Sequence, residues 1–205
     1  ILQNKKLNDK LRNFSSPEES RFLNDDMEKE TVTALSEAVS AHFSIAKEFY
    51  ALKAKLLGLK RLEYHERNVP YGKVEKEYLF EDSANLVKKV FSLLDEEFAE
   101  IFENFLKEGR IDVFPRKGKR SGAFCVWISK SKPIYVMLNH TNKLRDITTL
   151  AHEFGHAING ELSKKQNELQ FHTTTSTTEV ASTFMEDFVL EEILKHADDE
   201  LKLSI

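Results

Sequence analysis

The sequence predicts a mainly helical fold in which one small β-sheet precedes a central helix. Two stretches, residues 27–60 and 84–107, repeat their apolar side chains at close to the helical spacing of three and four residues. Only four Pro and seven Gly occur among the 205 residues, which argues against a loop-rich β-protein. A chain of this length suggests one domain, or one architecture of two lobes, and is long enough to bury a substantial core.

Two long helices are expected in the N-terminal half of the chain. The first, over residues 27–60, is amphipathic, and Gly58 marks its end because Gly readily takes the left-handed conformation that closes a helix. Ser83 is the expected N-cap of the second, since its hydroxyl can accept a bond from a free N–H of the first turn. This second helix, over residues 84–107, ends before Gly109.

The pattern then changes from helix to strand. The segments expected to form strands are short and rich in β-branched or aromatic side chains: residues 111–114, 123–128 and 134–138. A helix over about 147–159 follows, with Asp146 as its expected N-cap and Gly160 as its C-cap. The last long helix is expected over 177–196, and Asp198 is a candidate start for another.

Composition excludes several classes of protein. The net charge of −4 gives no reason to expect nucleic acid or an anionic membrane as a partner, and the basic run over 116–120 is short and flanks a turn. No stretch of about 18 apolar residues occurs, so no membrane span is expected. Cys125 is the only cysteine, which rules out an internal disulfide and fits a reducing, cytoplasmic location. No signal peptide is visible in a chain that begins at Ile1.

The run from His152 to His156 carries the strongest indication of chemistry. His152 and His156 are four residues apart, so they lie about 40° apart on one helix face and can both reach one zinc ion. Glu153 is rotated about 100° from His152, where it can take a proton from metal-bound water without being a ligand. Gly155 costs about 1 kcal/mol against Ala inside a helix, which suggests that another backbone or a ligand comes close. The alternative is a solvated helix face that merely carries two His and a Glu.

A catalytic zinc site commonly needs a third protein ligand. Glu179 is the candidate, because it lies 23 residues beyond His156 in the first turn of the next expected helix. From the residues alone, a helix-start carboxylate favoured by the helix dipole is an equally good explanation. Glu186 lies two turns further along the same face and can hydrogen-bond a ligand His, or can be an exposed charge.

Three separated blocks resemble the oligoendopeptidase F branch of the thimet-oligopeptidase-like metallopeptidases. Residues 146–157, which include the His-Glu motif, resemble the core of that family. Residues 115–124 resemble the stretch before the motif, and residues 171–186 resemble the helix of the third ligand. The resemblance implies a helical zincin-like metallopeptidase lobe with one Zn²⁺ per chain.

The resemblance also implies roles for single residues. His152, His156 and Glu179 are expected to bind zinc, Glu153 to act as the general base and Glu186 to orient a ligand. The implied reaction is hydrolysis of internal bonds in short peptides by a zinc-activated water.

Substrate contacts are expected at two places. The segment Gly122, Ala123 and Phe124 would offer backbone groups to an extended peptide, although it can also be an ordinary sheet strand. His172 matches a family position in a loop and is a candidate for substrate contact. Partners are thus expected to be short peptides, with neither nucleic acid nor membrane.

Members of the family are considerably longer than this chain. Their C-terminal helical part supplies Tyr and His residues that help to bind substrate and stabilise the oxyanion. We therefore expect one continuous architecture truncated at its C-terminus: a helical region over 1–109, then a small sheet with the zinc-binding helices of the catalytic domain over 110–205. Two alternatives stay open, a zinc carboxypeptidase and a non-catalytic fragment, and the intact Glu153 argues against the second.

Overall fold

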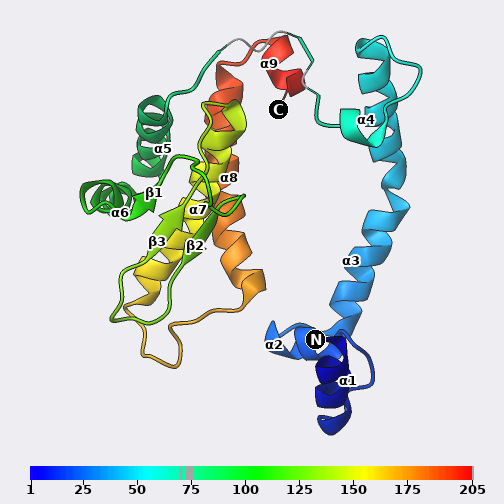
Figure 1. Cartoon of the computed structure of the whole chain (residues 1–205), viewed down its shortest axis with the longest axis vertical. Coiled ribbons are helices and arrows are strands. Elements are labelled where there is room, and N and C mark those ends of the chain that lie inside the picture. Colours follow the sequence, from blue (N-terminus) through cyan, green and yellow to red (C-terminus); the bar gives the residue numbers. More distant parts are fainter. Residues whose placement is uncertain (70, 73–75, 205) are drawn as a thin grey trace. The chain divides into compact units, whose positions relative to one another are not determined.

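The computed structural model describes residues 1–69, 71–72 and 76–204 (Figure 1). The chain divides into two compact units, Ile1–Tyr71 and Gly72–Ile205. The expected fold, mainly helical with a small three-stranded sheet, is confirmed. The expected regions 1–109 and 110–205 were separated where the sequence changes from helix to strand. That boundary differs from the division between these two units. Within the described part of the chain, no helix has the length and apolar character needed to cross a membrane.

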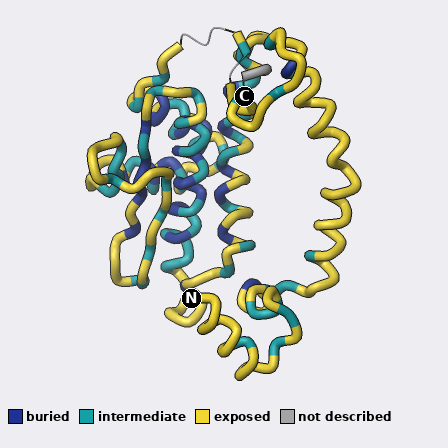
Figure 2. The backbone as a smooth tube through the Cα atoms, turned by 45° about the vertical axis from the view of Figure 1, so that its right-hand side comes forward, coloured by how far each residue is buried: buried dark blue, intermediate teal, exposed yellow. Residues whose placement is uncertain are grey.

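The first unit is helical. Its elements are α1 (Leu2–Leu11), α2 (Glu19–Asn24), α3 (Lys29–Ala41), α4 (Phe43–Leu56) and the short 3-10 helix η1 (Tyr64–Glu66). Among its described residues only Asp25 and Ala54 are buried, as the exposure colours show (Figure 2).

The single helix expected over 27–60 is interrupted at His42. The N–H of His42 bonds to the carbonyl of Val39, three residues back, and its ring Nδ1 lies 2.7 Å from the carbonyl of Ala38. The side chain thus takes the acceptor that a continuing α-helix would use, which separates α3 from α4. Gly58, with φ of +70°, follows the end of α4 as expected.

The second unit holds the sheet and the longer helices. Its elements are α5 (Phe80–Leu94), α6 (Glu96–Lys107), β1 (Ile111–Asp112), β2 (Phe124–Val126), β3 (Tyr135–Met137), α7 (Leu144–Ser163), α8 (Thr175–Lys195) and α9 (Asp199–Ser204). The central strand β3 pairs in parallel with β1 and antiparallel with β2, with Phe124 opposite Met137. Strand β2 is therefore an edge strand.

The helix expected over 84–107 is two helices, α5 and α6. Asp95 separates them with extended backbone angles, and its Oδ1 accepts a bond from the N–H of Glu97 at 2.8 Å, which caps α6. Ser83 is not an N-cap, which corrects the prediction. It is fully buried inside α5, where its hydroxyl donates to the carbonyl of Leu79 at 2.9 Å.

The boundaries of α7 also differ from the prediction. The helix begins at Leu144 rather than after Asp146. Asp146 still serves the helix start, because its Oδ2 accepts the N–H groups of Thr141 at 2.7 Å and Lys143 at 2.9 Å. Gly160 is not a C-cap but a buried residue of α7, where a Cβ atom would lie 2.6 Å from Cδ1 of Ile134. The helix continues past it to Ser163.

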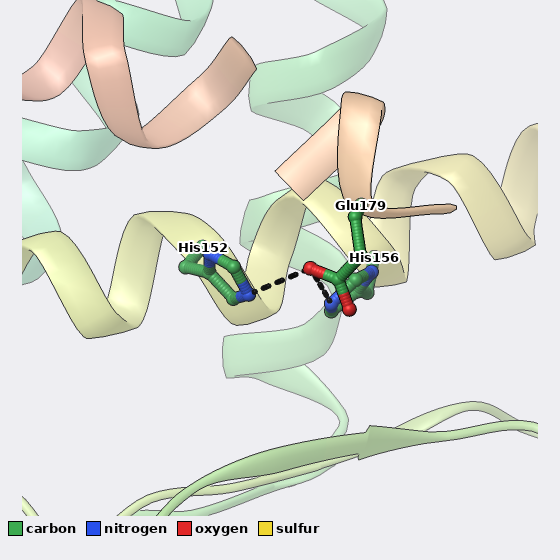
Figure 3. A group of neighbouring side chains, drawn as sticks. All are labelled: His152, His156 and Glu179. Atoms are coloured by element: carbon green, nitrogen blue, oxygen red, sulfur yellow. Dashed lines mark ion pairs between the residues drawn. The ribbon is translucent and has the colours of Figure 1, made fainter. Parts of the chain in front are cut away.

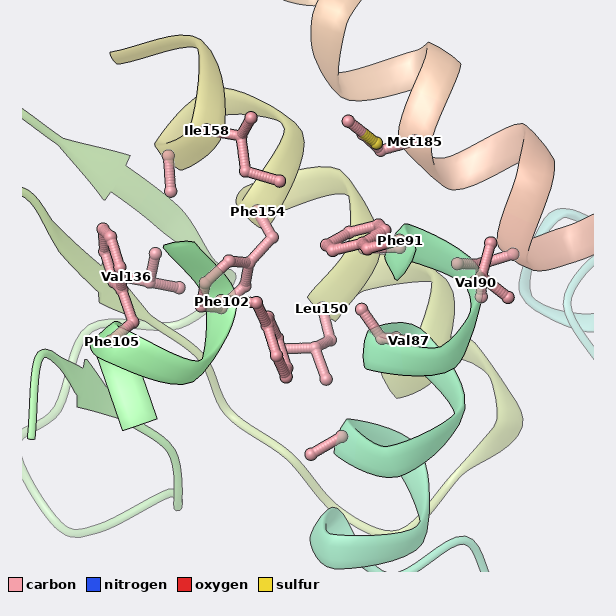
Figure 4. Close-up of a cluster of buried hydrophobic side chains, with 14 of the residues drawn as sticks. Val87, Val90, Phe91, Phe102, Phe105, Val136, Leu150, Phe154, Ile158 and Met185 are labelled. Atoms are coloured by element: carbon pink, nitrogen blue, oxygen red, sulfur yellow. The ribbon is translucent and has the colours of Figure 1, made fainter. Parts of the chain in front are cut away.

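An aromatic cluster holds α7 in place. Phe154 of α7 lies with its ring centroid 4.4 Å from Phe102 and 5.2 Å from Phe105, both of α6 (Figure 4). Phe91 of α5 extends the cluster with an edge-to-face contact to Phe102. All four rings are fully buried, and burial of each such side chain contributes about 1.5–3 kcal/mol. The cluster thereby fixes one face of α7 and leaves another face for chemistry.

Candidate metal centre

The two histidines project from the less buried side of α7. Leu150, Ala151 and Phe154 are fully buried in the core, while His152 and His156 are only partly buried. Their ring centroids lie 5.0 Å apart and the rings are nearly perpendicular. This is the placement that the four-residue spacing predicted.

Helix α8 brings a carboxylate to both rings. Oε2 of Glu179 lies 3.5 Å from Nε2 of His152 and 3.8 Å from Nε2 of His156 (Figure 3). One donor atom from each of the three residues lies within 4.8 Å of the other two. Donors at 2.0–2.1 Å from a tetrahedral zinc ion would lie about 3.3 Å apart, so two imidazoles and one carboxylate in these positions fit zinc.

Gly155 explains how α8 comes so close to α7. A Cβ atom on Gly155 would lie 2.5 Å from Cα of Ser182 and 2.6 Å from the carbonyl oxygen of Ala181. The sequence predicted a close approach at this glycine, and the structure confirms it. Ser182, for which no sequence pattern indicated a role, donates its hydroxyl to Oε2 of Glu179 at 3.1 Å and steadies the carboxylate.

Glu186 contacts His152 from the side away from Glu179. Its Oε2 lies 2.9 Å from Nδ1 of His152, which favours the tautomer that carries its proton on Nδ1. Nε2 of His152 then keeps a free lone pair toward Glu179. Burial lowers the pKa of His156, and the nearby Glu179 carboxylate opposes that change. A neutral imidazole is the form that binds a metal.

Glu153 lies beside this group but is not one of its three donors. Its residue exposure is 7%, and burial is the main reason that its pKa rises to about 7. The carboxylates of Glu179 and Glu186 raise the pKa further, while His152 lowers it. A carboxylate with a pKa near neutrality can both accept and return a proton.

A cavity of about 510 Å³ opens next to His152 and Glu153. Gly122 and Ala123, which directly precede the edge strand, line it together with Asn139. The amide of Asn139 donates to the carbonyls of Arg120 at 2.9 Å and Gly122 at 2.8 Å. Asn139 therefore fixes the turn that leads into β2, a role that no local pattern in the sequence indicates.

Two of the expected substrate residues lie elsewhere. Phe124 does not line this cavity; it lines another, beside Asp112 and Tyr135. His172 is exposed, and its Nε2 lies 3.2 Å from the carbonyl of Ile128. Neither is among the described residues around His152 and Glu153, and their contact with substrate stays a prediction.

Comparison with known proteins gives one consistent family. The model of peptidase family M3 matches residues 1–202. The oligoendopeptidase F homologue of Borreliella burgdorferi is 30% identical over 198 residues, which are 95% of this chain and 33% of that protein. The oligopeptidase PepF of Bacillus subtilis is 26% identical over 93% of this chain and 29% of its own length. The chain thus spans about a third of the relatives it matches.

Solved structures agree with the fold. A structure assigned as oligoendopeptidase F from Bacillus anthracis has a TM-score of 0.79 at 24% identity, and the match covers 92% of this chain and 36% of that one. A peptidase structure from Chlamydophila abortus has a TM-score of 0.76 at 25% identity, covering 98% of this chain and 34% of that one. The family match runs through nearly every residue of the sequence, and the chain belongs to peptidase family M3.

Proposed function

We propose that this chain forms the zinc site of an endopeptidase that hydrolyses internal bonds of short peptides. The observation that carries the proposal is the donor group of His152, His156 and Glu179, whose atoms are spaced as zinc ligands would be. Two helices supply this group, and Gly155 allows them to meet. The buried carboxylate of Glu153 beside this group supports a role in proton transfer.

Glu153 is the proposed general base. A bound zinc ion would supply Lewis acidity, which polarises a carbonyl and acidifies water. The carboxylate of Glu153 takes the proton of the attacking water and later passes it to the nitrogen of the leaving amine. Glu186 keeps the imidazole of His152 oriented through its 2.9 Å contact with Nδ1.

The edge strand is the proposed seat of the peptide. Gly122 and Ala123 lie directly before β2, whose outer edge is unpaired among the described residues, and both line the cavity beside Glu153. An extended peptide can add to such an edge through backbone hydrogen bonds. Backbone contacts of this kind suit peptides of varied sequence. The relatives named oligoendopeptidase are consistent with short substrates.

Two variants test these roles. Glu153→Gln keeps the shape and removes the base, so zinc should stay bound while hydrolysis is lost. Loss of zinc instead would make Glu153 a ligand and overturn its assignment. Glu179→Ala should weaken zinc binding sharply, and unchanged affinity would move the third ligand elsewhere.

Product analysis tests the reaction itself. A peptide blocked at both termini should be cut internally, which mass spectrometry of the products detects. Release of single residues from an unblocked C-terminus alone would indicate a carboxypeptidase. Zinc binding without cleavage of either peptide would contradict an active endopeptidase and favour a non-catalytic chain.

A further inference from the structure

We infer that Arg145 binds a carboxylate of the peptide that occupies the cavity beside His152 and Glu153. The inference rests on the proposed peptidase function and adds a preference for acidic substrates to it. It starts from the placement of Arg145, an exposed residue of the first turn of α7 that lines this cavity.

Helix geometry places Arg145 at a defined distance from the metal group. Arg145 precedes His152 by seven residues, so the two lie within about 20° of each other around the helix axis. They are about 10 Å apart along that axis. Thr148 and Thr149 lie between them and also line the cavity. One cavity wall therefore runs from the metal ligand to the guanidinium.

The guanidinium of Arg145 has no partner among the residues that the structure describes. The carboxylate of the adjacent Asp146 accepts the N–H groups of Thr141 and Lys143, so it is engaged at the helix start. Glu186 is engaged with His152. The two carboxylates are thus held by other partners, and neither pairs with the guanidinium of Arg145.

The charged side chains of the cavity lining are Arg145 and the carboxylates of Asp146, Glu153 and Glu186. Glu153 and Glu186 place negative charge near His152, whereas Arg145 is the only Arg or Lys among the described residues that line the cavity. Away from the metal group, Arg145 is therefore the side chain of this lining that can pair with a peptide carboxylate. Arg binds carboxylates through paired N–H groups in a planar fork, which makes it a selective partner for this group.

The distance predicts where the carboxylate sits in the substrate. An extended peptide rises about 3.3 Å per residue, so 10 Å corresponds to about three residues from the bond at the metal group. The carboxylate is either an acidic side chain at that position or the C-terminus of a peptide that ends there. Both have the same chemistry, and peptide variants separate them.

Peptide binding to the zinc-loaded chain tests the inference without relying on turnover. Fluorescence anisotropy would be measured in the Glu153→Gln background with labelled peptides that carry Glu or Gln three residues from the central bond, each as free acid and as amide. We expect the charged peptide to bind about three- to fivefold more tightly at low salt, with the difference shrinking at high salt. The Gln peptide lacks the side-chain carboxylate and the amide lacks the C-terminal carboxylate, so their affinities show which of the two Arg145 binds.

Variants of two neighbouring cations give the matched comparison. Arg145→Gln should weaken binding of the charged peptide about three- to fivefold and so remove the preference, and Arg145→Lys should restore part of it. Lys143→Gln removes the same charge two residues away, outside the cavity lining, and should leave the preference intact.

The outcomes separate this inference from the proposed function. A preference that survives Arg145→Gln, or that is absent from the parent chain, overturns the role of Arg145 while zinc binding and internal cleavage by the parent can still stand. Equal loss in Lys143→Gln shows a general charge effect and also overturns it. Absence of zinc and of all peptide binding would overturn both.

Discussion

Gly155→Ala is a sensitive test of how the metal centre is built. In an ordinary helix this change stabilises a protein by about 1 kcal/mol, because Ala has the better helix propensity. Here the new Cβ would lie 2.5 Å from Cα of Ser182 and 2.6 Å from the carbonyl oxygen of Ala181. Both contacts are to backbone of α8, which cannot rotate away. Since carbon atoms approach favourably only to about 3.5 Å, the helices would have to part by about 1 Å.

That separation has two measurable consequences. Overpacking of this kind costs about 1–3 kcal/mol, so after the gain in propensity the free energy of unfolding should fall by about 0–2 kcal/mol. Glu179 is part of α8 and would move with it, so the distances of 3.5 Å and 3.8 Å from its Oε2 to the two imidazoles should lengthen. Zinc affinity should then fall about tenfold or more, a loss typical of disturbed support for metal ligands.

Urea unfolding of the metal-free protein and zinc titration by chelator competition measure the two effects. Gly160→Ala is the matched control, because its Cβ would meet the end of the Ile134 side chain at 2.6 Å rather than the backbone of α8. Ile134 can adjust, so zinc affinity should be kept. A Gly155→Ala protein that is about 1 kcal/mol more stable, with unchanged zinc affinity, would refute the close packing of the two helices.

Three further substitutions follow from the same structure. Glu186→Ala removes the 2.9 Å partner of the ligand imidazole and should lower zinc affinity about 10- to 100-fold in a competition assay. Arg110→Met removes an ion pair of 2.6 Å to Glu161, and because both groups are partly exposed, urea unfolding should show a loss of about 1–3 kcal/mol with zinc affinity unchanged. Asn139→Ala frees the carbonyl of Gly122 and should weaken peptide binding a few-fold in anisotropy; equal affinity would contradict a role in fixing the edge strand.

The features that sequence patterns predicted well are local. The spacing of His152 and His156 translates directly into a shared helix face, and the cost of a glycine inside a helix pointed correctly to a close approach at Gly155. Glu179 is different, because its meeting with α7 depends on packing between helices far apart in the sequence. From the residues alone, Glu179 was equally well explained as a metal ligand and as a helix-start carboxylate. Only the family resemblance favoured the metal ligand.

The incorrect predictions of the fold concern the residues at which helices begin and end. Ser83 lies inside α5, which already begins at Phe80, and Asp95 divides the expected helix because its carboxylate caps α6. Asp146 caps α7 from its third position rather than from the residue before it. Asn139 could not have been identified from its neighbours, because its two acceptors lie 17 and 19 residues away.

The metal ligands themselves can be measured directly. X-ray absorption at the zinc edge, with metal analysis of the purified chain, should show one zinc ion bound by two imidazole nitrogens and a carboxylate oxygen, and the carboxylate contribution should disappear in Glu179→Ala together with most of the affinity. A chain that holds no zinc, or one whose zinc shell is the same after that substitution, would contradict the account.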